Sequence, residues 1–242
     1  WIINGKLYAH SKNQLFNRLY EWSGKKWVKA TIGLPVKDQP ILFDDDKYIV
    51  FGDCQGEWGG TIYFFDKASN ETYFTESTCA NSVLKKNRSY LVLAHLGHMM
   101  GSSEIKSIPD PRQLSKAKNS AVNKTKEGQA LGYSDKSDAY QKTLDLFGIQ
   151  LFSTFEHGDR QLYIAHLNGL TFLTEIDGSE IKIVHPLFNK EIYTHYPITK
   201  NYGNYTLMNL DFYGTARDKE VSVIIIRNGK LTKVDWNENQ SR

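Results

Sequence analysis

The chain has 242 residues, 40% of them hydrophobic and 13% aromatic, with 30 basic and 27 acidic residues and a net charge of +3. This composition fits an ordered, sheet-rich globular protein that is large enough to bury a core. The charges are mixed along the chain, which argues against an extended nucleic-acid surface, and no apolar run approaches the ~20 residues of a membrane-spanning helix.

Predicted strands occur in groups that follow one plan along the chain. The first group lies at 6–10, 15–22 and 26–29, and the second at 40–43, 47–51, 61–65 and 71–75. The third lies at 89–95 and 104–108, the fourth at 150–155, 161–166, 171–176 and 181–185, and the fifth at 192–196, 205–211, 221–227 and 230–236. Turn residues separate the runs, and Asp177-Gly178 and Asn228-Gly229 are typical of two-residue hairpins. Each group therefore predicts a small antiparallel sheet.

One strand in each group ends in His or Asp. These end residues are His10, Asp53, His95, His166 and Asp211, and their spacings are 43, 42, 71 and 45 residues. Three of the spacings match one four-stranded propeller blade, which takes roughly 40–50 residues. The pattern predicts a repeat architecture with a polar group at an equivalent point in each repeat.

In its spacing and strand pattern the chain resembles the β-propeller superfamily in general, over almost its whole length. The resemblance implies an all-β, five-bladed propeller of four-stranded antiparallel blades, because packing such sheets around an axis covers both faces of each. We expect a single domain over residues 1–242. The alternative architecture is a four-bladed ring with a separate N-terminal piece.

The long spacing between the third and fourth repeats is explained by a polar segment near 115–148. We expect this segment to be a partly helical insertion on the rim. Ser137 is a suitable helix cap, Tyr140, Leu144 and Phe147 share one helical face, and Gly148 is suited to end the helix.

Two cysteines and the first residue bear on the cellular compartment. Cys54 follows Asp53, and Cys79 lies between the second and third repeats, so both are expected on the same rim. We expect a disulfide between them; the alternative is two buried thiols. Together with a first residue, Trp1, that is not Met, a disulfide favours an extracytoplasmic or secreted protein.

The recurring His and Asp side chains have two interpretations. Three imidazoles and two carboxylates at one axial mouth would suit a divalent metal. In the WD-repeat propellers that the sequence resembles in outline, however, an Asp after the second strand holds its own turn. Recurrence in every repeat favours this structural role, because a turn is needed five times and a catalytic residue once. We predict no firm metal site and no cofactor.

Departures from the repeat are better candidates for a binding site. The second repeat adds a glycine-rich loop with Glu57 and Trp58, a pairing suited to sugars because the indole stacks and the carboxylate accepts hydrogen bonds. The alternative is that Trp58 is a buried plug. The third repeat adds His98 three residues after His95, and the fifth adds Arg217, which is suited to an anion. For His98 the alternative is a role in core filling with its neighbouring methionines.

The chain contains no complete nucleophile or metal-protease motif, and no catalytic residue is assigned. The leading hypothesis is a monomeric, non-enzymatic propeller that binds a carbohydrate or a protein partner on its loop-rich rim. The candidate ligand-binding residues are Glu57, Trp58, His98, Asp53, His95, His166, Asp211 and His10. The alternatives are a glycoside hydrolase or metal-dependent hydrolase with its site at the axial mouth, and a structural scaffold without a small ligand.

Overall fold

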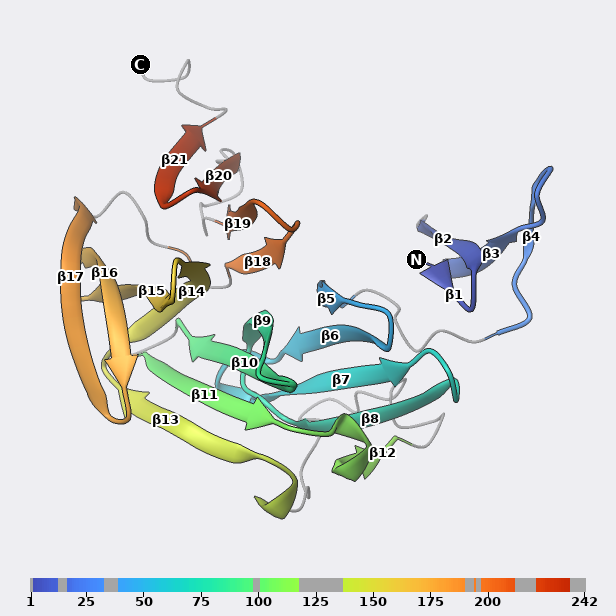
Figure 1. The fold of residues 1–242 in the computed structure, drawn as a ribbon, viewed down its shortest axis with the longest axis horizontal. Helices are drawn as coiled ribbons and strands as arrows, with labels where there is room; N and C mark the ends of the chain where they lie inside the picture. The colour runs from blue at the N-terminus through green and yellow to red at the C-terminus, as the bar shows by residue number, and fades with distance from the viewer. Residues whose placement is uncertain are drawn as a thin grey trace.

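The computed structural model describes residues 2–12, 17–32, 39–97, 101–117, 137–189, 194, 197–211 and 221–235. These residues form five antiparallel sheets of four or five strands and three 3-10 turns (Figure 1). The prediction of an all-β, propeller-like fold built from five antiparallel sheets is confirmed. No helix in the described residues is long and apolar enough to cross a membrane.

The first three sheets contain the strands up to residue 147. The N-terminal sheet runs in the order β1 (Ile2–Ile3), β2 (Lys6–Lys12), β3 (Asn17–Trp22) and β4 (Trp27–Lys29). The second sheet is ordered β12 (Ser115–Lys116), β8 (Glu71–Glu76), β7 (Gly60–Asp66), β6 (Tyr48–Cys54) and β5 (Ile41–Asp44). The third is ordered β13 (Gln141–Phe147), β11 (Ser102–Ile108), β10 (Ser89–Leu96) and β9 (Ala80–Lys86).

The last two sheets are meanders in chain order. The fourth comprises β14 (Gln150–His157), β15 (Arg160–Leu167), β16 (Leu170–Asp177) and β17 (Glu180–Asn189). The fifth comprises β18 (Ile198–Asn201), β19 (Thr206–Asp211), β20 (Val221–Arg227) and β21 (Lys230–Asp235). Both hairpins predicted from their turn residues are confirmed. At Asn228-Gly229 the two residues have φ values of 50° and 72°, as a type I′ turn requires.

Neighbouring sheets pack face to face, and each pair has its own apolar core. Ile3 and Tyr8 of the N-terminal sheet pack against Phe51 and Phe65 of the second sheet. The second sheet meets the third around Tyr90, and separate clusters join the third sheet to the fourth and the fourth to the fifth. In the second, third and fourth sheets, alternating side chains of the central strands therefore contribute to two different cores, as expected for stacked blades.

The first strands of four sheets lie together at the centre of the molecule. β5, β9, β14 and β18 contact one another there (Figure 1). The N-terminal sheet packs instead on the outward face of the second sheet. Among the described residues, no core cluster joins the fifth sheet to the N-terminal sheet.

The segment between the third and fourth repeats differs from the expected insertion. The predicted helix is wrong: Ser137–Ala139 is a single 3-10 turn, and Gln141–Phe147 is strand β13, paired with β11. At the other end of the segment, Ser115–Lys116 pairs with β8. The apolar spacing of Tyr140, Leu144 and Phe147 fitted a helix, but the open edge of β11 offered a full ladder of backbone hydrogen bonds, and tertiary pairing overrode that local pattern. Strand β9 was not predicted either.

Candidate functional site

A disulfide fixes one rim of the second sheet. Cys54, at the end of β6, is bonded to Cys79, in the link between β8 and β9, with their Cα atoms 4.2 Å apart. The predicted disulfide is confirmed. It ties the β6–β7 loop to the connection between the second and third sheets, so both segments are held on the same rim.

Asp53, next to this disulfide, forms a hydrogen bond within its own hairpin. Its side chain is buried, and its Oδ1 accepts a hydrogen bond from Thr61 N at 2.7 Å. Burial raises the pKa of Asp53 to about 6, although the hydrogen bond from Thr61 N acts in the opposite direction. The contact agrees with the turn-holding interpretation.

His95 belongs to a polar bridge between the third and fourth sheets. Asn81 Nδ2 donates to His95 Nδ1 at 2.9 Å and also to the backbone oxygen of Leu151 at 2.9 Å. All these groups are buried, and the bridge satisfies polar atoms that would otherwise be costly inside the protein. His95 therefore has a structural contact to the adjacent blade.

His166 occupies an equivalent position one blade further along. Its Nδ1 lies 3.1 Å from Thr171 Oγ1 in the neighbouring strand. The ring of Phe152 lies between the two imidazoles, stacked on His166 and edge-on to His95, with centroid distances of 5.3 and 5.5 Å. Burial lowers the pKa of His166, which favours a neutral ring among apolar neighbours.

The remaining members of the predicted set are outside what the structure describes. Strands β2 and β19 include the backbones of His10 and Asp211, but their side chains are outside the described residues, as are all of His98 and Arg217. Asp53, His95 and His166 each have a partner within or beside their own sheet. The described residues contain no group of three or more His, Cys, Asp or Glu placed to hold a metal ion.

Trp58 is presented to solvent by an ordered loop. Gly56–Trp58 form a 3-10 turn, and Trp58 N donates to Gln55 O at 3.2 Å. The side chain of Trp58 is 67% exposed, and Glu57 is also exposed. The alternative prediction, in which Trp58 is a buried plug, is wrong.

A polar cleft lies beside the same loop, between the second and third sheets. Gly60, two residues after Trp58, accepts a hydrogen bond through its backbone oxygen from Ser77 N at 3.0 Å, and Ser77 lines the cleft. The cleft has a volume of about 210 Å³. Its lining comprises Glu76, Ser77, Thr78, Ala94, His95, Leu96, Ser102, Ser103, Glu104, Lys106, Lys142, Asp145 and Phe147.

Charged side chains from β11 and β13 form the floor and wall of the cleft. The Lys106 side chain is only 1% exposed; its Nζ donates to Glu76 O, lies 3.4 Å from Glu104 Oε1 and sits 4.7 Å from the ring centroid of Tyr140. Lys142 Nζ lies 3.6 Å from Glu104 and 3.0 Å from Asp145. Carboxylates and ammonium groups are therefore fixed side by side, offering both acceptors and donors to a ligand.

These cleft residues were missed by the sequence reasoning. Glu104 and Lys106 are two positions apart, so on a strand they point to the same face, and this spacing was a usable signal. Lys142, Asp145 and Phe147 were hidden because their segment was predicted as a helix. Phe147 is 80% exposed and adds an aromatic ring to the cleft's edge.

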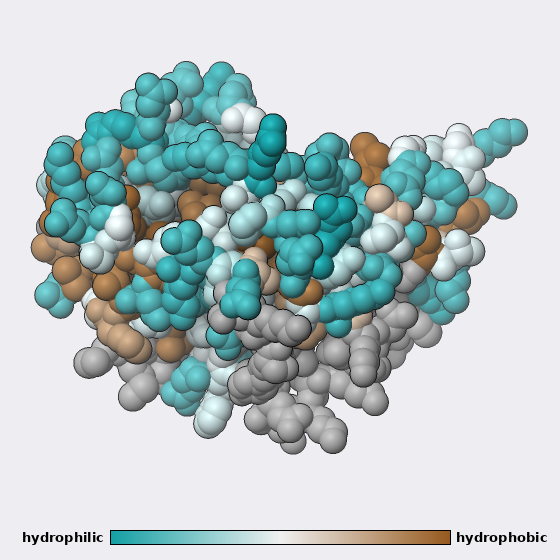
Figure 2. All heavy atoms as spheres, turned by 60° about the horizontal axis from the view of Figure 1, so that its bottom comes forward, coloured by the Kyte–Doolittle hydropathy of each residue, from teal (hydrophilic) through white to brown (hydrophobic). Residues whose placement is uncertain are grey.

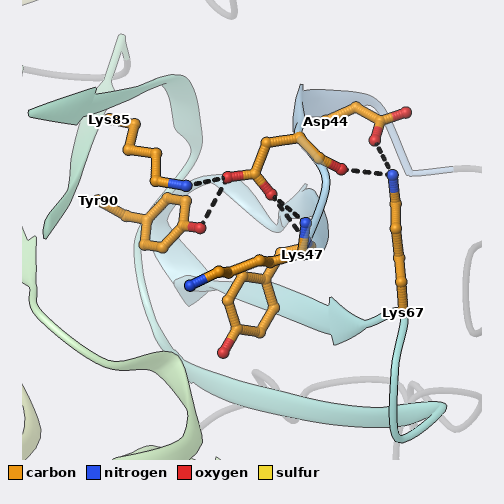
Figure 3. Close-up of polar contacts among 7 residues, drawn as sticks. Asp44, Lys47, Lys67, Lys85 and Tyr90 are labelled. Atoms are coloured by element: carbon orange, nitrogen blue, oxygen red, sulfur yellow. Dashed lines mark hydrogen bonds and ion pairs between the residues drawn. The ribbon is translucent and has the colours of Figure 1, made fainter. Parts of the chain in front are cut away.

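The opposite rim has its own polar network, which is structural (Figure 3). Asp45, in the β5–β6 turn, accepts hydrogen bonds from Lys85 Nζ at 2.5 Å and Tyr90 Oη at 2.9 Å. Asp45 Oδ1 also accepts from Tyr48 N at 2.8 Å. Burial alone would raise the pKa of Asp45, but these hydrogen bonds outweigh it and lower the pKa. The network joins the second sheet to the third.

Comparisons with known proteins do not identify a family for this chain. No protein-family model matches the chain, and no curated protein matches it. The chain is similar to a crystal structure of a Bacteroides fragilis protein that has been assigned as a 6-phosphogluconolactonase. The two align with 11% identity and a TM-score of 0.34, and the alignment covers 96% of this chain and 81% of that one.

Proposed function

We propose that the protein is a binding module that takes a carbohydrate on the disulfide-bearing rim, at Trp58 and the adjacent cleft. The observation that carries this proposal is the 67% exposure of Trp58 on a loop held by the Cys54–Cys79 disulfide. A large apolar ring held in water by a fixed loop is suited to stacking on the apolar face of a sugar ring. Little conformational entropy is lost on binding when the platform is already ordered.

The cleft supplies the polar part of the proposed site. Hydroxyl groups of a sugar need paired donors and acceptors, and Glu104, Lys142 and Asp145 offer both within one cleft. The cleft volume of about 210 Å³ suits a small unit such as one sugar ring. The same disulfide supports an extracytoplasmic location for the protein.

The test is a glycan array followed by calorimetric titration of the best ligand. We expect Trp58→Ala to weaken binding about five- to thirtyfold, because lost burial and stacking of the ring cost on the order of 1–2 kcal/mol. Trp27→Ala is the matched control, since Trp27 is 44% exposed but lies in the N-terminal sheet. Equal affinity of the wild type and Trp58→Ala would overturn the assignment.

Glycoside hydrolysis is the alternative use of the same cleft. It requires two carboxyl groups flanking the sugar bond, one of them able to donate a proton. Glu104 and Asp145 line the cleft, but both are ion-paired with Lys142. Release of new reducing ends from a bound glycan, lost in Glu104→Gln, would establish hydrolysis in place of simple binding.

A further inference from the structure

The N-terminal sheet has an apolar face that no described core cluster covers. We call it the N-terminal outer face, and it comprises Ile2, Leu7, Trp22 and Trp27. Their exposed fractions are 63%, 43%, 38% and 44%. Four large apolar side chains exposed on one small sheet are a marker of an interaction surface.

Strand register places these side chains on the same face. Ile2 pairs with Leu7, and Trp22 pairs with Trp27. Tyr8 pairs with Glu21, so the antiparallel register brings Leu7 opposite Trp22. Ile3 and Tyr8 point the other way, into the core shared with the second sheet, as the two-residue period of a strand requires.

The two tryptophans frame an ordered hairpin tip. Their ring centroids are 5.3 Å apart at an interplanar angle of 60°. Ser23 N and Ser23 Oγ both donate to Lys26 O, at 3.0 and 2.8 Å, which closes the turn. The hairpin projects from the body of the molecule at the right of Figures 1 and 2, where hydrophobic and hydrophilic residues lie side by side.

Positive charge is concentrated at the hairpin end of this face, whereas Ile2 and Leu7 at the other end share a pocket with Asp44, Asp45, Asp46 and Lys67. Residues 1–32 contain six basic residues and one acidic residue, Glu21, a net charge of +5, whereas the whole chain carries only +3. Lys25 and Lys26 are exposed at the hairpin tip, and Lys29 is exposed on β4. The one acidic group is paired with Lys6 at 2.8 Å. The partner of the hairpin end of this face should therefore be negatively charged.

We propose that the N-terminal outer face binds the interface of an anionic lipid bilayer, with the Trp22–Trp27 hairpin at the level of the headgroups. Tryptophan prefers that level because its ring is apolar and its N–H is polar, and lysines beside it attract anionic headgroups. Ile2 and Leu7 favour lipid over nucleic acid, since aliphatic side chains gain from an acyl boundary but do not stack on bases. A second copy is disfavoured because two hairpins of the same positive charge would repel.

The experiment is co-sedimentation of the whole protein with phosphatidylcholine vesicles that contain or lack phosphatidylglycerol. We expect binding only with phosphatidylglycerol, weakened by added salt because part of the attraction is screened. Lys25→Glu/Lys26→Glu should weaken binding at least about tenfold, since each lysine near an anionic surface contributes about 1 kcal/mol. Trp22→Ala/Trp27→Ala should weaken it at least about tenfold through lost apolar burial.

Two matched controls separate this surface from other sites. Arg227→Glu/Lys230→Glu reverses two basic residues that flank the last hairpin and should leave vesicle binding unchanged. Trp58→Ala should also leave it unchanged, so this proposal and the proposed function can fail separately. The Lys25→Glu/Lys26→Glu variant keeps both tryptophans, so it tests the surface even if the Trp22→Ala/Trp27→Ala variant loses the hairpin. The thermal melts of both variants are compared with that of the wild type.

Four results would overturn the proposal. The first is absence of binding to phosphatidylglycerol vesicles, and the second is equal binding by the Trp22→Ala/Trp27→Ala variant. The third is equally tight binding to heparin or duplex DNA that does not depend on the tryptophans, which would indicate a general polyanion surface. The fourth is a dimer by light scattering that becomes a monomer in the tryptophan variant, which would indicate that a second copy covers the face.

Discussion

His166 stacks on Phe152, with ring centroids 5.3 Å apart and an interplanar angle of 22°. Phe152 belongs to the core between the fourth and fifth sheets, so the imidazole is part of the apolar packing of two blades. A ring in this setting is stable when neutral, because protonation would place a charge against hydrocarbon.

The first prediction follows from the lowered pKa of His166. In the unfolded chain His166 binds a proton near the ordinary histidine pKa of 6.5, and in the folded protein it binds one only at lower pH. The stabilising contribution is therefore present above pH 6.5 and is lost as the pH falls towards the lowered value. We expect His166→Gln to lose less of its free energy of unfolding on acidification than wild type, measured by urea unfolding across this range. The control is His185→Gln, at an exposed histidine. If the free energy of unfolding of His166→Gln depends on pH as in the wild type, the argument is contradicted.

Asp53 should show the opposite pH dependence. Its pKa is raised from 3.8 to about 6, so its contribution to stability is present below pH 3.8 and is lost as the pH rises through about 6. Asp53→Asn keeps an oxygen that can accept from Thr61 N and removes the buried charge. Relative to wild type, the free energy of unfolding of this variant should rise by on the order of 1–3 kcal/mol from acidic to neutral pH, as measured by urea unfolding. The exposed Asp159→Asn should show no such gain.

Much of the fold could be predicted from the sequence, because alternating apolar residues and turn pairs such as Asn228-Gly229 are local signals. The errors came where tertiary pairing decides. The sequence of β13 has the apolar spacing of an amphipathic helix. The segment forms a strand because it pairs with the free edge of β11. The recurring His and Asp residues marked equivalent points correctly, but their partners, such as Asn81 for His95, come from other strands and sheets.

Only some residues of the candidate site could be identified from the sequence, for the same reason. Trp58 and Glu57 were identified because they depart from the repeat, and Trp58 is exposed as the binding interpretation requires. The cleft was missed, since Lys106 and Lys142 come together only when β11 and β13 pair. A sequence pattern shows which face of a strand carries charge, but not which neighbouring sheet closes the cleft.

The Cys54–Cys79 disulfide should contribute to the stability of the folded protein. Cys54 and Cys79 are 25 residues apart, and closing a loop of this size is expected to stabilise the folded state by about 3 kcal/mol. Cys54→Ser/Cys79→Ser should lower the free energy of unfolding by about that amount in urea titrations. Reduction of the wild type should reproduce the loss. If the reduced protein instead unfolds at the same urea concentration, the disulfide does not hold the rim together.

The final prediction concerns the close packing that joins the Trp58 loop to the cleft. A Cβ atom at Gly60 would lie 2.6 Å from Asp53 O and 2.7 Å from Ser77 O, and both are backbone atoms with little freedom to move. Gly60→Ala should therefore lower the free energy of unfolding by at least about 2 kcal/mol and shift the loop that presents Trp58. Gly56→Ala is the matched control: it meets nothing within 4 Å but has a φ of +61°, so its cost should be only about 1 kcal/mol. Urea unfolding measures both variants, and glycan titration shows whether Gly60→Ala weakens binding more than Gly56→Ala does. Equal stability of the two variants would contradict the packing argument.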